Sequence, residues 1–395
     1  MNNAGLQLLH AQKIQGTNLC VGLDPHYEVN GTYNEAFYSQ FSSGSWTPFD
    51  ELTDAVGDFL FSEAPSFGEV TIARQEHRTI GFLVGVTEYF KRAILAAWKS
   101  GIRVFKPQSS FYEVYGPFGP LVLMTLVHYI RSLADEAGHP SFILLDAKRG
   151  DIDSTQTRYY QAYLAGRDEE IIPGMPGPFG FDSMTVTTWM GEDVLTPGLP
   201  FFKNGKGATV VTRSSNPSGT TLQDLVATTN PFVALNDKQA KFRFDGASMG
   251  EIENLVMRTP TPAVHEVMLY VTEQFSAKHE LNQNGISPIF SVMGSTVKMD
   301  TTFRKLRPTG LALVPGFGAQ GGKFENVMPL VIRDGPHKGH VGLFAASRAS
   351  NYAWTKEYGG SGDPANMDED MARAIDKFRR NEKQAYTDAG LYYPY

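Results

Sequence analysis

The chain has 395 residues, of which 42% are hydrophobic and 19% charged, so it can bury a large core and is not globally disordered. Its 35 basic and 42 acidic side chains leave a net charge of −7, which excludes a nucleic-acid surface along the whole chain but allows a local cationic pocket for a small anion. Cys20 is the only cysteine, which excludes an intrachain disulfide framework and a zinc cluster built on cysteine. Residues 1–16 carry no secretory pattern and no apolar run is long enough to span a membrane, so we expect a cytoplasmic protein.

Short apolar runs alternate along the chain with longer segments of helical periodicity, and no repeat of roughly 20–50 residues is present. The expected strands are Leu19–Leu23, Ile102–Lys106, Ser141–Asp146, Ser183–Thr187, Ala208–Arg213, Ser287–Met293, Gly310–Pro315 and His340–Ala346. The expected helices include Gln75–Lys99, Gly119–Ala137, Pro262–Lys278 and Gly322–Ile332. Strands that are apolar on both faces and alternate with helices indicate a parallel sheet, and eight such units favour a closed (β/α)8 TIM barrel over an open sheet.

Three stretches of the chain do not belong to the eight strand-and-helix units. Glu28–Val70 follows the first strand and Ala227–Thr261 follows the fifth, so both insertions are expected on the catalytic face, although ordinary surface elaboration is an equal alternative. We expect residues 1–350 to form the catalytic barrel and residues 351–395 to form a C-terminal helical extension packed on it. One helical stripe of this tail comprises Met367, Met371, Ile375 and Phe378.

Charged side chains concentrate where the strands end, which is where barrel enzymes carry their catalytic groups. Asp146 and Lys148 lie two apart at the end of the third strand, so both are predicted to point into the barrel mouth. Asp151 follows on the turn, and Lys106 ends the neighbouring strand. Such alternating charges keep the lysines protonated and the carboxylates ionised, as a fixed field acting on developing charge. A surface ion-pair network is the alternative interpretation.

A glycine-rich turn follows the seventh strand. Gly316, Gly318, Gly321 and Gly322 free the backbone there, and a helix is expected to begin near Gly322, so that its backbone N–H groups favour a phosphate. Arg348, at the end of the eighth strand, is expected to bind the same phosphate. The spacing also matches a dinucleotide-binding fingerprint, which we reject because no βαβαβ half follows it.

Five motifs occur in order along the chain. They are Gly22-Leu23-Asp24-Pro25, Phe105-Lys106-Pro107-Gln108, Leu145-Asp146-Ala147-Lys148-Arg149-Gly150-Asp151-Ile152, Ser215-Asn216-Pro217, and Leu313-Val314-Pro315-Gly316 with Gly318-Ala319-Gln320-Gly321-Gly322. Together they resemble orotidine 5′-phosphate decarboxylase, in the subgroup whose catalytic segment reads D-A-K-R-G-D-I.

The resemblance implies a homodimeric barrel that converts orotidine 5′-phosphate to uridine 5′-phosphate without a cofactor or a metal, as a step of pyrimidine synthesis. The implied reacting groups are Lys106, Asp146 facing the substrate carboxylate, Lys148 protonating C6, and Asp151. The implied binding groups are Asp24 with Lys106 at the ribose, Thr155 with Asp151 in the partner's site, Ser215 at the pyrimidine edge, Gln320 and Arg348 at the phosphate, and further contacts from Asn216, Gly318, Gly321 and Gly322.

Two positions depart from the family pattern, and two other functions stay open. Asp153 stands where glycine is usual, which adds a negative charge close to an anionic ligand, and Ser214 replaces a threonine. One alternative is a metal-dependent sugar-phosphate decarboxylase or aldolase whose D-x-K-x-x-D acids bind the metal. The other is a non-catalytic nucleotide-binding protein, although a pure binder does not need carboxylates beside an anionic ligand. A lysine Schiff base also stays open at this point.

Overall fold

The computed structural model describes residues 3–26, 28–29, 32–41, 66–225, 262–317 and 320–395. The expected insertion 227–261 lies outside the described residues, and of 28–70 only the outer parts lie within them. These parts are a small hairpin of β2 (Glu28–Val29) and β3 (Thr32–Tyr33), the helix α2 (Asn34–Ser39) and the start of α4 (Ser66–Lys99).

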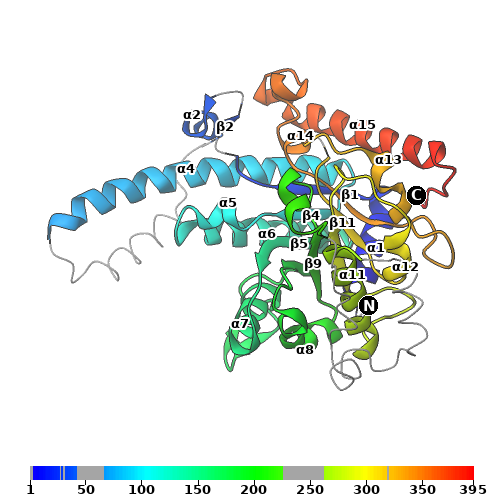
Figure 1. Cartoon of the computed structure of the whole chain (residues 1–395). Coiled ribbons are helices and arrows are strands. Elements are labelled where there is room, and N and C mark those ends of the chain that lie inside the picture. The colour runs from blue at the N-terminus through cyan, green and yellow to red at the C-terminus, as the bar shows by residue number, and fades with distance from the viewer. Residues whose placement is uncertain (1–2, 27, 30–31, 42–65, 226–261, 318–319) are drawn as a thin grey trace.

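Eight parallel strands close into a barrel in the order β1-β12-β11-β10-β9-β8-β5-β4 (Figure 1). Their bounds are β1 Leu19–Leu23, β4 Val104–Pro107, β5 Phe142–Arg149, β8 Ser183–Val186, β9 Gly207–Arg213, β10 Ile289–Met293, β11 Ala312–Val314 and β12 Gly342–Ala346. The predicted TIM barrel and its eight strands are confirmed, with differences only at the strand ends. A further hairpin, β6 (Glu170–Ile172) with β7 (Met175–Pro176), lies outside the barrel.

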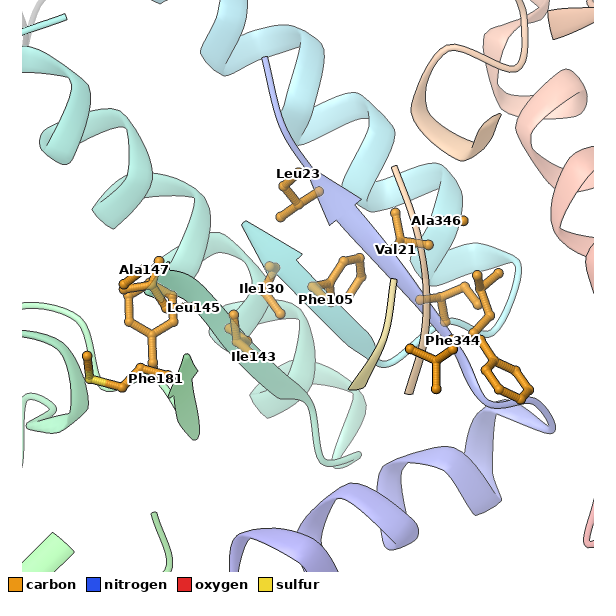
Figure 2. Close-up of a cluster of buried hydrophobic side chains, with 14 of the residues drawn as sticks. Val21, Leu23, Phe105, Ile130, Ile143, Leu145, Ala147, Phe181, Phe344 and Ala346 are labelled. Atoms are coloured by element: carbon orange, nitrogen blue, oxygen red, sulfur yellow. The ribbon is translucent and has the colours of Figure 1, made fainter. Parts of the chain in front are cut away.

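Alternate residues of the strands fill two separate cores. Leu144 of β5 belongs to the cluster inside the barrel together with Phe290 and the buried Cys20. Val21 and Leu145 point the other way, into the larger cluster between the strands and the helices (Figure 2). The alternation of β5 therefore directs Leu144, and two residues later Asp146, toward the barrel axis.

Helices surround this barrel. Their bounds are α1 Ala4–Gln15, α4 Ser66–Lys99, α5 Ser110–Glu113, α6 Phe118–Ala137, α7 Asp153–Leu164, α8 Leu199–Lys203, α11 Val264–Lys278, α12 Thr302–Leu306, α13 Phe324–Val327, α14 Arg348–Asn351 and α15 Met367–Asp388. Local chemistry sets the ends of α1, because the Asn3 side chain accepts from the Leu6 N–H and Gly16 takes the left-handed conformation that ends the helix. Figure 1 shows that α4 extends well beyond the barrel at its N-terminal end. Within the described residues, we find no helix with the length and apolar character needed to span a membrane.

The prediction of one continuous helix over Gly322–Ile332 is wrong. Only α13, four residues long, forms there, and a 3₁₀ turn over Met328–Leu330 follows it. Pro329 lies inside the expected helix, where its ring lacks an N–H and clashes with the preceding turn, so a regular helix cannot continue through it.

The tail after the last strand packs on the barrel rather than away from it. Met367, Met371 and Ile375 are fully buried and Phe378 packs against the same cluster, as the stripe predicts. α15 lies against α4, and its buried Glu382 accepts hydrogen bonds at the start of β1, among them one of 2.7 Å from the Asn18 side-chain amide. The expected boundary at residue 350 falls inside α14, which itself contacts β1.

Candidate active site

A cavity of about 450 Å³ lies at the carboxyl ends of the barrel strands. Apolar residues from the barrel interior, among them Val292, Leu313 and Ala345, form part of its wall. Polar residues expected from the sequence form much of the rest: Asp24, Lys106, Asp146, Lys148, Ser215, Asn216, Gln320 and Arg348. The structure therefore brings side chains from widely separated motifs into one cavity.

Asp146 lies between two lysines. Its Oδ1 is 2.6 Å from the Lys148 Nζ and accepts a second hydrogen bond of 2.8 Å from the Thr185 hydroxyl. Its Oδ2 is 3.4 Å from the Lys106 Nζ. The side chains of Lys106 and Asp146 are only 8% and 14% exposed, whereas that of Lys148 is 47% exposed. The exposed fraction singles out Lys148 as the lysine of this array that is most open to a ligand.

The opposite charges of this array stabilise one another in their ionised forms. Burial by itself raises the pKa of Asp146, but the charges of Lys106 and Lys148 and the hydrogen bonds from Lys148 and Thr185 outweigh it and lower the pKa to about 2. Burial acts on Lys106 in the opposite sense, and the charges of Asp24 and Asp146 outweigh it, so that its pKa lies above the usual value. At neutral pH the cavity therefore contains an ionised Asp146 beside a protonated Lys106.

Lys148 reaches the cavity by a backbone path that simple alternation does not predict. Its φ is 49°, in the left-handed region, and the register between β5 and β8 shifts between Leu145 and Arg149. The Lys148 N–H donates to the Thr185 hydroxyl at 2.8 Å, which fixes this turn. The prediction that Lys148 faces the mouth beside Asp146 is thus met through a bulge rather than a straight strand.

Asp24 directly follows β1 and keeps one carboxylate oxygen without a partner among the described residues. Its Oδ1 is buried without a hydrogen-bond partner, while the Tyr352 hydroxyl donates to its backbone carbonyl at 3.1 Å. The preceding carbonyl, of Leu23, accepts from the Tyr112 hydroxyl at 2.6 Å. A fixed backbone and an unpaired carboxylate oxygen suit this position to accept hydrogen bonds from a ligand hydroxyl.

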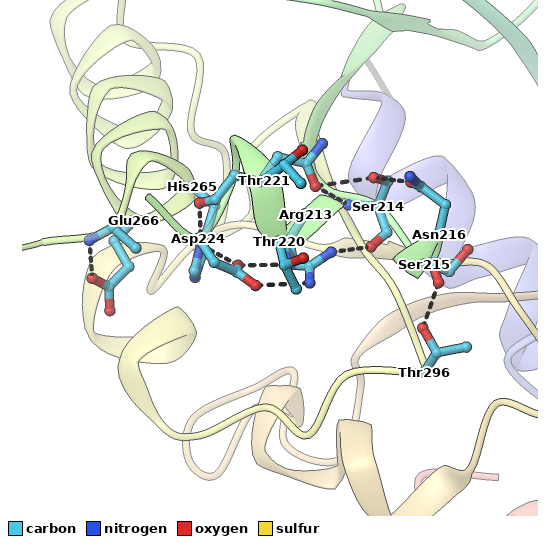
Figure 3. Close-up of polar contacts among 12 residues, drawn as sticks. Arg213, Ser214, Ser215, Asn216, Thr220, Thr221, Asp224, His265, Glu266 and Thr296 are labelled. Carbon is cyan, nitrogen blue, oxygen red and sulfur yellow. Dashed lines mark hydrogen bonds and ion pairs between the residues drawn. The ribbon is translucent and has the colours of Figure 1, made fainter. Parts of the chain in front are cut away.

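The opposite side of the cavity carries the loop after β9. The Ser215 hydroxyl donates to Oε1 of Gln320 at 2.7 Å, which joins this loop to the glycine-rich turn. The Ser214 hydroxyl donates to Oδ1 of Asn216 at 2.6 Å (Figure 3). Ser215, Asn216 and Gln320 therefore form one connected polar surface.

The glycine-rich turn is closed by a backbone hydrogen bond from the Gly322 N–H to the Gly316 carbonyl at 3.0 Å. A Cβ on Gly322 would lie 1.9 Å from the Ser295 Oγ, so this close approach requires glycine. Gly316 lines the cavity, whereas Gly321 and Gly322 are not among the lining residues, and Gly318 lies outside the described residues. α13 begins at Phe324, two residues after the expected start, but it is only four residues long, so the structure does not provide the long helix whose N-terminus was expected at the phosphate.

Arg348 lines the cavity as the first residue of α14, with only Ser347 between it and β12. It interacts with the Tyr358 side chain, which lies beyond α14 in the tail. The tail therefore contributes to the position of an arginine in the cavity wall.

Three other acidic or polar positions lie apart from this wall. Asp151 and Thr155 do not line the cavity, and the Asp151 Oδ1 accepts from the Ile152 N–H at 2.8 Å. Thr155 is exposed on α7. Asp153 is the exposed first residue of α7, with φ of 47°, where its charge favours the helix N-terminus rather than meeting a ligand in this cavity.

The cavity is also lined by residues that the sequence analysis did not place in the site, among them Gln108, Phe111, His26 and Ser347. Gln108 belongs to the motif Phe105-Lys106-Pro107-Gln108, and Phe111 comes three residues after it. The motif therefore already indicated that both residues lie near the site. His26 follows Asp24-Pro25, and burial lowers its pKa below the usual value, so that it is neutral at pH 7. Ser347 precedes Arg348 and lies against the backbone of Gly22, a contact with no sequence signal.

The chain resembles known proteins along most of its length. The model of the orotidine 5′-phosphate decarboxylase / HUMPS family matches residues 17–288. An orotidine 5′-phosphate decarboxylase of Rhodopirellula baltica is 30% identical over 232 residues, which cover 58% of this chain and 62% of that protein. The enzyme of that name from Streptomyces coelicolor is 28% identical over 235 residues, covering 59% of this chain and 66% of that protein. The matches therefore span just under two thirds of these relatives.

Solved structures show the same fold. The orotidine 5′-monophosphate decarboxylase of Plasmodium berghei superposes with a TM-score of 0.60 at 17% identity, covering 97% of this chain and 98% of that one. The family match ends just before β10, so the segments that carry Gln320 and Arg348 lie beyond it. Since the match nevertheless takes in more than half of the chain, including the strands that bear Lys106, Asp146 and Lys148, the chain belongs to the orotidine 5′-phosphate decarboxylase / HUMPS family.

Proposed function

We propose that the chain is a cytoplasmic, cofactor-free enzyme that decarboxylates orotidine 5′-phosphate to uridine 5′-phosphate. The observation that carries this proposal is the ionised Asp146 held between Lys106 and Lys148 in the wall of the cavity. The family match and the names of the curated relatives support the same activity. The arrangement acts on a substrate that is itself an anion and becomes a carbanion during the reaction.

The cavity offers a place for each part of this nucleotide. The ribose hydroxyls would bind the free Oδ1 of Asp24 together with Lys106. The phosphate would bind Arg348 and Gln320, next to Gly316 of the glycine-rich turn. The base would then lie between Lys148 and the loop of Ser215 and Asn216.

The chemical step follows from the array. Asp146 faces the substrate carboxylate, so that the loss of CO₂ removes a repulsion between two like charges. The bond between C6 and the carboxylate carbon breaks, the electron pair stays on C6, and the Lys148 ammonium stabilises it and then transfers its proton to C6. Lys148 afterwards takes a proton from solvent. Binding at the phosphate supplies free energy for holding the substrate in this unfavourable position.

We also propose a homodimer in which Asp151 and Thr155 act in the partner's cavity. Asp151 precedes α7 and Thr155 lies in its first turn, and neither lines the cavity of its own chain. Exposed apolar side chains gather at the ends of the neighbouring strands β5 and β8, where Ile152, Trp189 and Met190 are exposed and Trp189 is 73% exposed. Such a patch beside the exposed Thr155 suits an interface that completes two sites at once.

A metal-dependent sugar-phosphate reaction on the same barrel is the less favoured function. It needs the acids of the D-x-K-x-x-D segment to converge on a cation, whereas Asp146 already pairs with two lysines and Asp151 lies outside the cavity wall. The test is an absorbance assay of orotidine 5′-phosphate with the purified chain, with and without EDTA. Turnover that is insensitive to EDTA is expected. Loss of turnover in EDTA supports the metal enzyme, and tight nucleotide binding without turnover supports a binding protein.

A further inference from the structure

A cluster behind the cavity wall fixes the loop that carries Ser214 and Ser215. Arg213 ends β9 with a side chain that is only 3% exposed, and its guanidinium pairs with both carboxylate oxygens of Asp224 at 2.7 and 2.8 Å. The same guanidinium donates to the Ser214 carbonyl at 2.6 Å (Figure 3). Arg213 therefore connects its ion pair with the partly exposed Asp224 to the backbone of the loop.

Gln223 holds Ser214 from a second direction. Its Oε1 accepts from the N–H of Ser214 at 2.9 Å and lies 2.9 Å from the Ser214 Oγ, whose own proton goes to Asn216. The backbone carbonyl of Gln223 accepts from the N–H of His265 at 3.0 Å, and the His265 Nδ1 lies 3.3 Å from Asp224. The cluster is thus attached to the first turn of α11 as well as to β9.

Ser215 is held on its other side by the end of β10. The Thr296 hydroxyl donates to the Ser215 carbonyl at 2.6 Å. A Cβ on Gly294 would lie 2.6 Å from the backbone N and Cα of Ser215, so only glycine lets the loop approach this closely. These contacts fix the backbone of Ser215. What remains to be set is the direction of its side chain and of its O–H bond.

That direction is set by Gln320. Because the Ser215 O–H donates to Oε1 of Gln320, the Ser215 oxygen is left as a hydrogen-bond acceptor. Uracil presents an N3–H donor on its pairing edge, whereas cytosine presents an acceptor at N3. A Ser215 oxygen held at a fixed position therefore matches uracil and repels cytosine.

We propose that Arg213, Gln223 and Asp224 are positioning residues that determine how the site discriminates between pyrimidine bases. None of the three lines the cavity. Arg213 and Gln223 hold the backbone of Ser214 and, through it, the oxygen of Ser215, and Asp224 holds Arg213 in place. The proposal rests on the proposed function, in which Ser215 reads the edge of the base.

The test measures the dissociation constants of uridine 5′-phosphate and cytidine 5′-phosphate by calorimetry on the full chain. Both nucleotides carry the same ribose phosphate, so any effect through Gln320 or Arg348 on phosphate binding cancels in their ratio. The variants are Asp224→Asn, which breaks the ion pair of the buried Arg213, and Gln223→Ala, which leaves no buried charge unpaired. The control is Glu273→Gln, which likewise breaks the ion pair of a buried arginine, Arg307 at 2.9 Å, away from the cavity.

The wild-type chain is expected to prefer uridine 5′-phosphate. This preference should fall about tenfold in Asp224→Asn and severalfold in Gln223→Ala, because one hydrogen bond is worth on the order of a tenfold change in affinity. Glu273→Gln should lower the melting temperature and keep the preference within about twofold of wild type.

Several results overturn the inference alone. They are a wild-type chain that binds both nucleotides equally, variants that keep the wild-type ratio, and an equal loss of preference in the control. A wild-type chain that binds neither nucleotide overturns the proposed function, and the inference with it. If Asp224→Asn does not fold, the ratio in Gln223→Ala decides between these results.

Discussion

The Nζ of Lys148 lies 2.6 Å from the Oδ1 of Asp146, although the two residues are joined by a turn of left-handed backbone at Lys148. A non-glycine residue in that conformation costs about 1–3 kcal/mol. The Thr185 hydroxyl offsets part of this cost, because it accepts from the Lys148 N–H and donates to the same oxygen of Asp146. One threonine on β8 thereby aligns the backbone of the lysine and the side chain of the aspartate.

Replacing Lys148 should separate catalysis from binding. Lys148→Ala removes the ammonium that would protonate C6, so turnover of orotidine 5′-phosphate should fall by at least about 10³-fold, a typical contribution of a positioned proton donor combined with charge stabilisation. The affinity for uridine 5′-phosphate should change little, since the contact is made mainly in the transition state. Steady-state kinetics and calorimetry on the same preparation check both parts. A variant with near-wild-type turnover would remove Lys148 from the mechanism.

The stability of the protein in acid should depend on Asp146. Its pKa is lowered in the folded protein from 3.8 to about 2, so the ionised carboxylate stabilises the fold above pH 4 and this contribution is lost as the pH falls toward 2. Between about pH 5 and about pH 3, the free energy of unfolding of the wild type should therefore fall by about 1 kcal/mol more than that of Asp146→Asn.

Urea unfolding followed by circular dichroism at several pH values measures this difference. Asp300→Asn is a suitable control, because Asp300 is exposed and lies outside the cavity. Parallel pH curves for the wild type and Asp146→Asn would show that the folded protein does not depress the pKa of Asp146.

The barrel could be predicted from sequence because its strands are apolar on both faces, a pattern that parallel barrels share and that local composition reveals. The residues at the ends of those strands followed from the same argument. The position of Lys148 was predicted for the wrong reason, since a bulge cannot be read from the spacing of Asp146 and Lys148. The prediction of a long helix after Gly322 was wrong because the apolar spacing of the segment was given more weight than Pro329, which interrupts a helix.

The support behind the cavity could not be predicted at all. Arg213, Asp224 and His265 come from the end of a strand, an irregular segment and the start of a helix, and only the folded chain brings them together. Their charges show no periodic pattern that would separate a buried ion pair from charges at the surface.

The dimer with shared cavities can be tested by mixing two inactive variants. Asp151→Ala removes a group proposed to act in the partner's cavity, and Lys148→Ala removes one that acts in its own. After subunit exchange, a mixed dimer contains one cavity with both intact residues, so activity should return to at most a quarter of the wild-type level, from half of the dimers with one working site each.

Exchange itself is checked by mass spectrometry of differently tagged chains. Mixing Lys148→Ala with Asp146→Asn serves as the control, because both changes affect the same cavity and no mixed dimer should regain activity. Exchange without any recovery of activity in the first mixture would mean that each chain builds its own site.

Arg348 should act on the phosphate of the substrate and not on its base. It lines the cavity at the start of α14, one strand after the glycine-rich turn, and a charge-assisted contact to a phosphate is worth about 1.5–3 kcal/mol. Arg348→Ala should therefore lower kcat/KM for orotidine 5′-phosphate by roughly 10- to 150-fold, and affect the phosphate-free nucleoside orotidine much less. Tyr358→Phe removes only the hydroxyl that interacts with Arg348 and should cause a smaller loss for the same substrate. An equal proportional loss for nucleotide and nucleoside in Arg348→Ala would instead assign Arg348 to the shape of the cavity rim, and the phosphate would then need another partner.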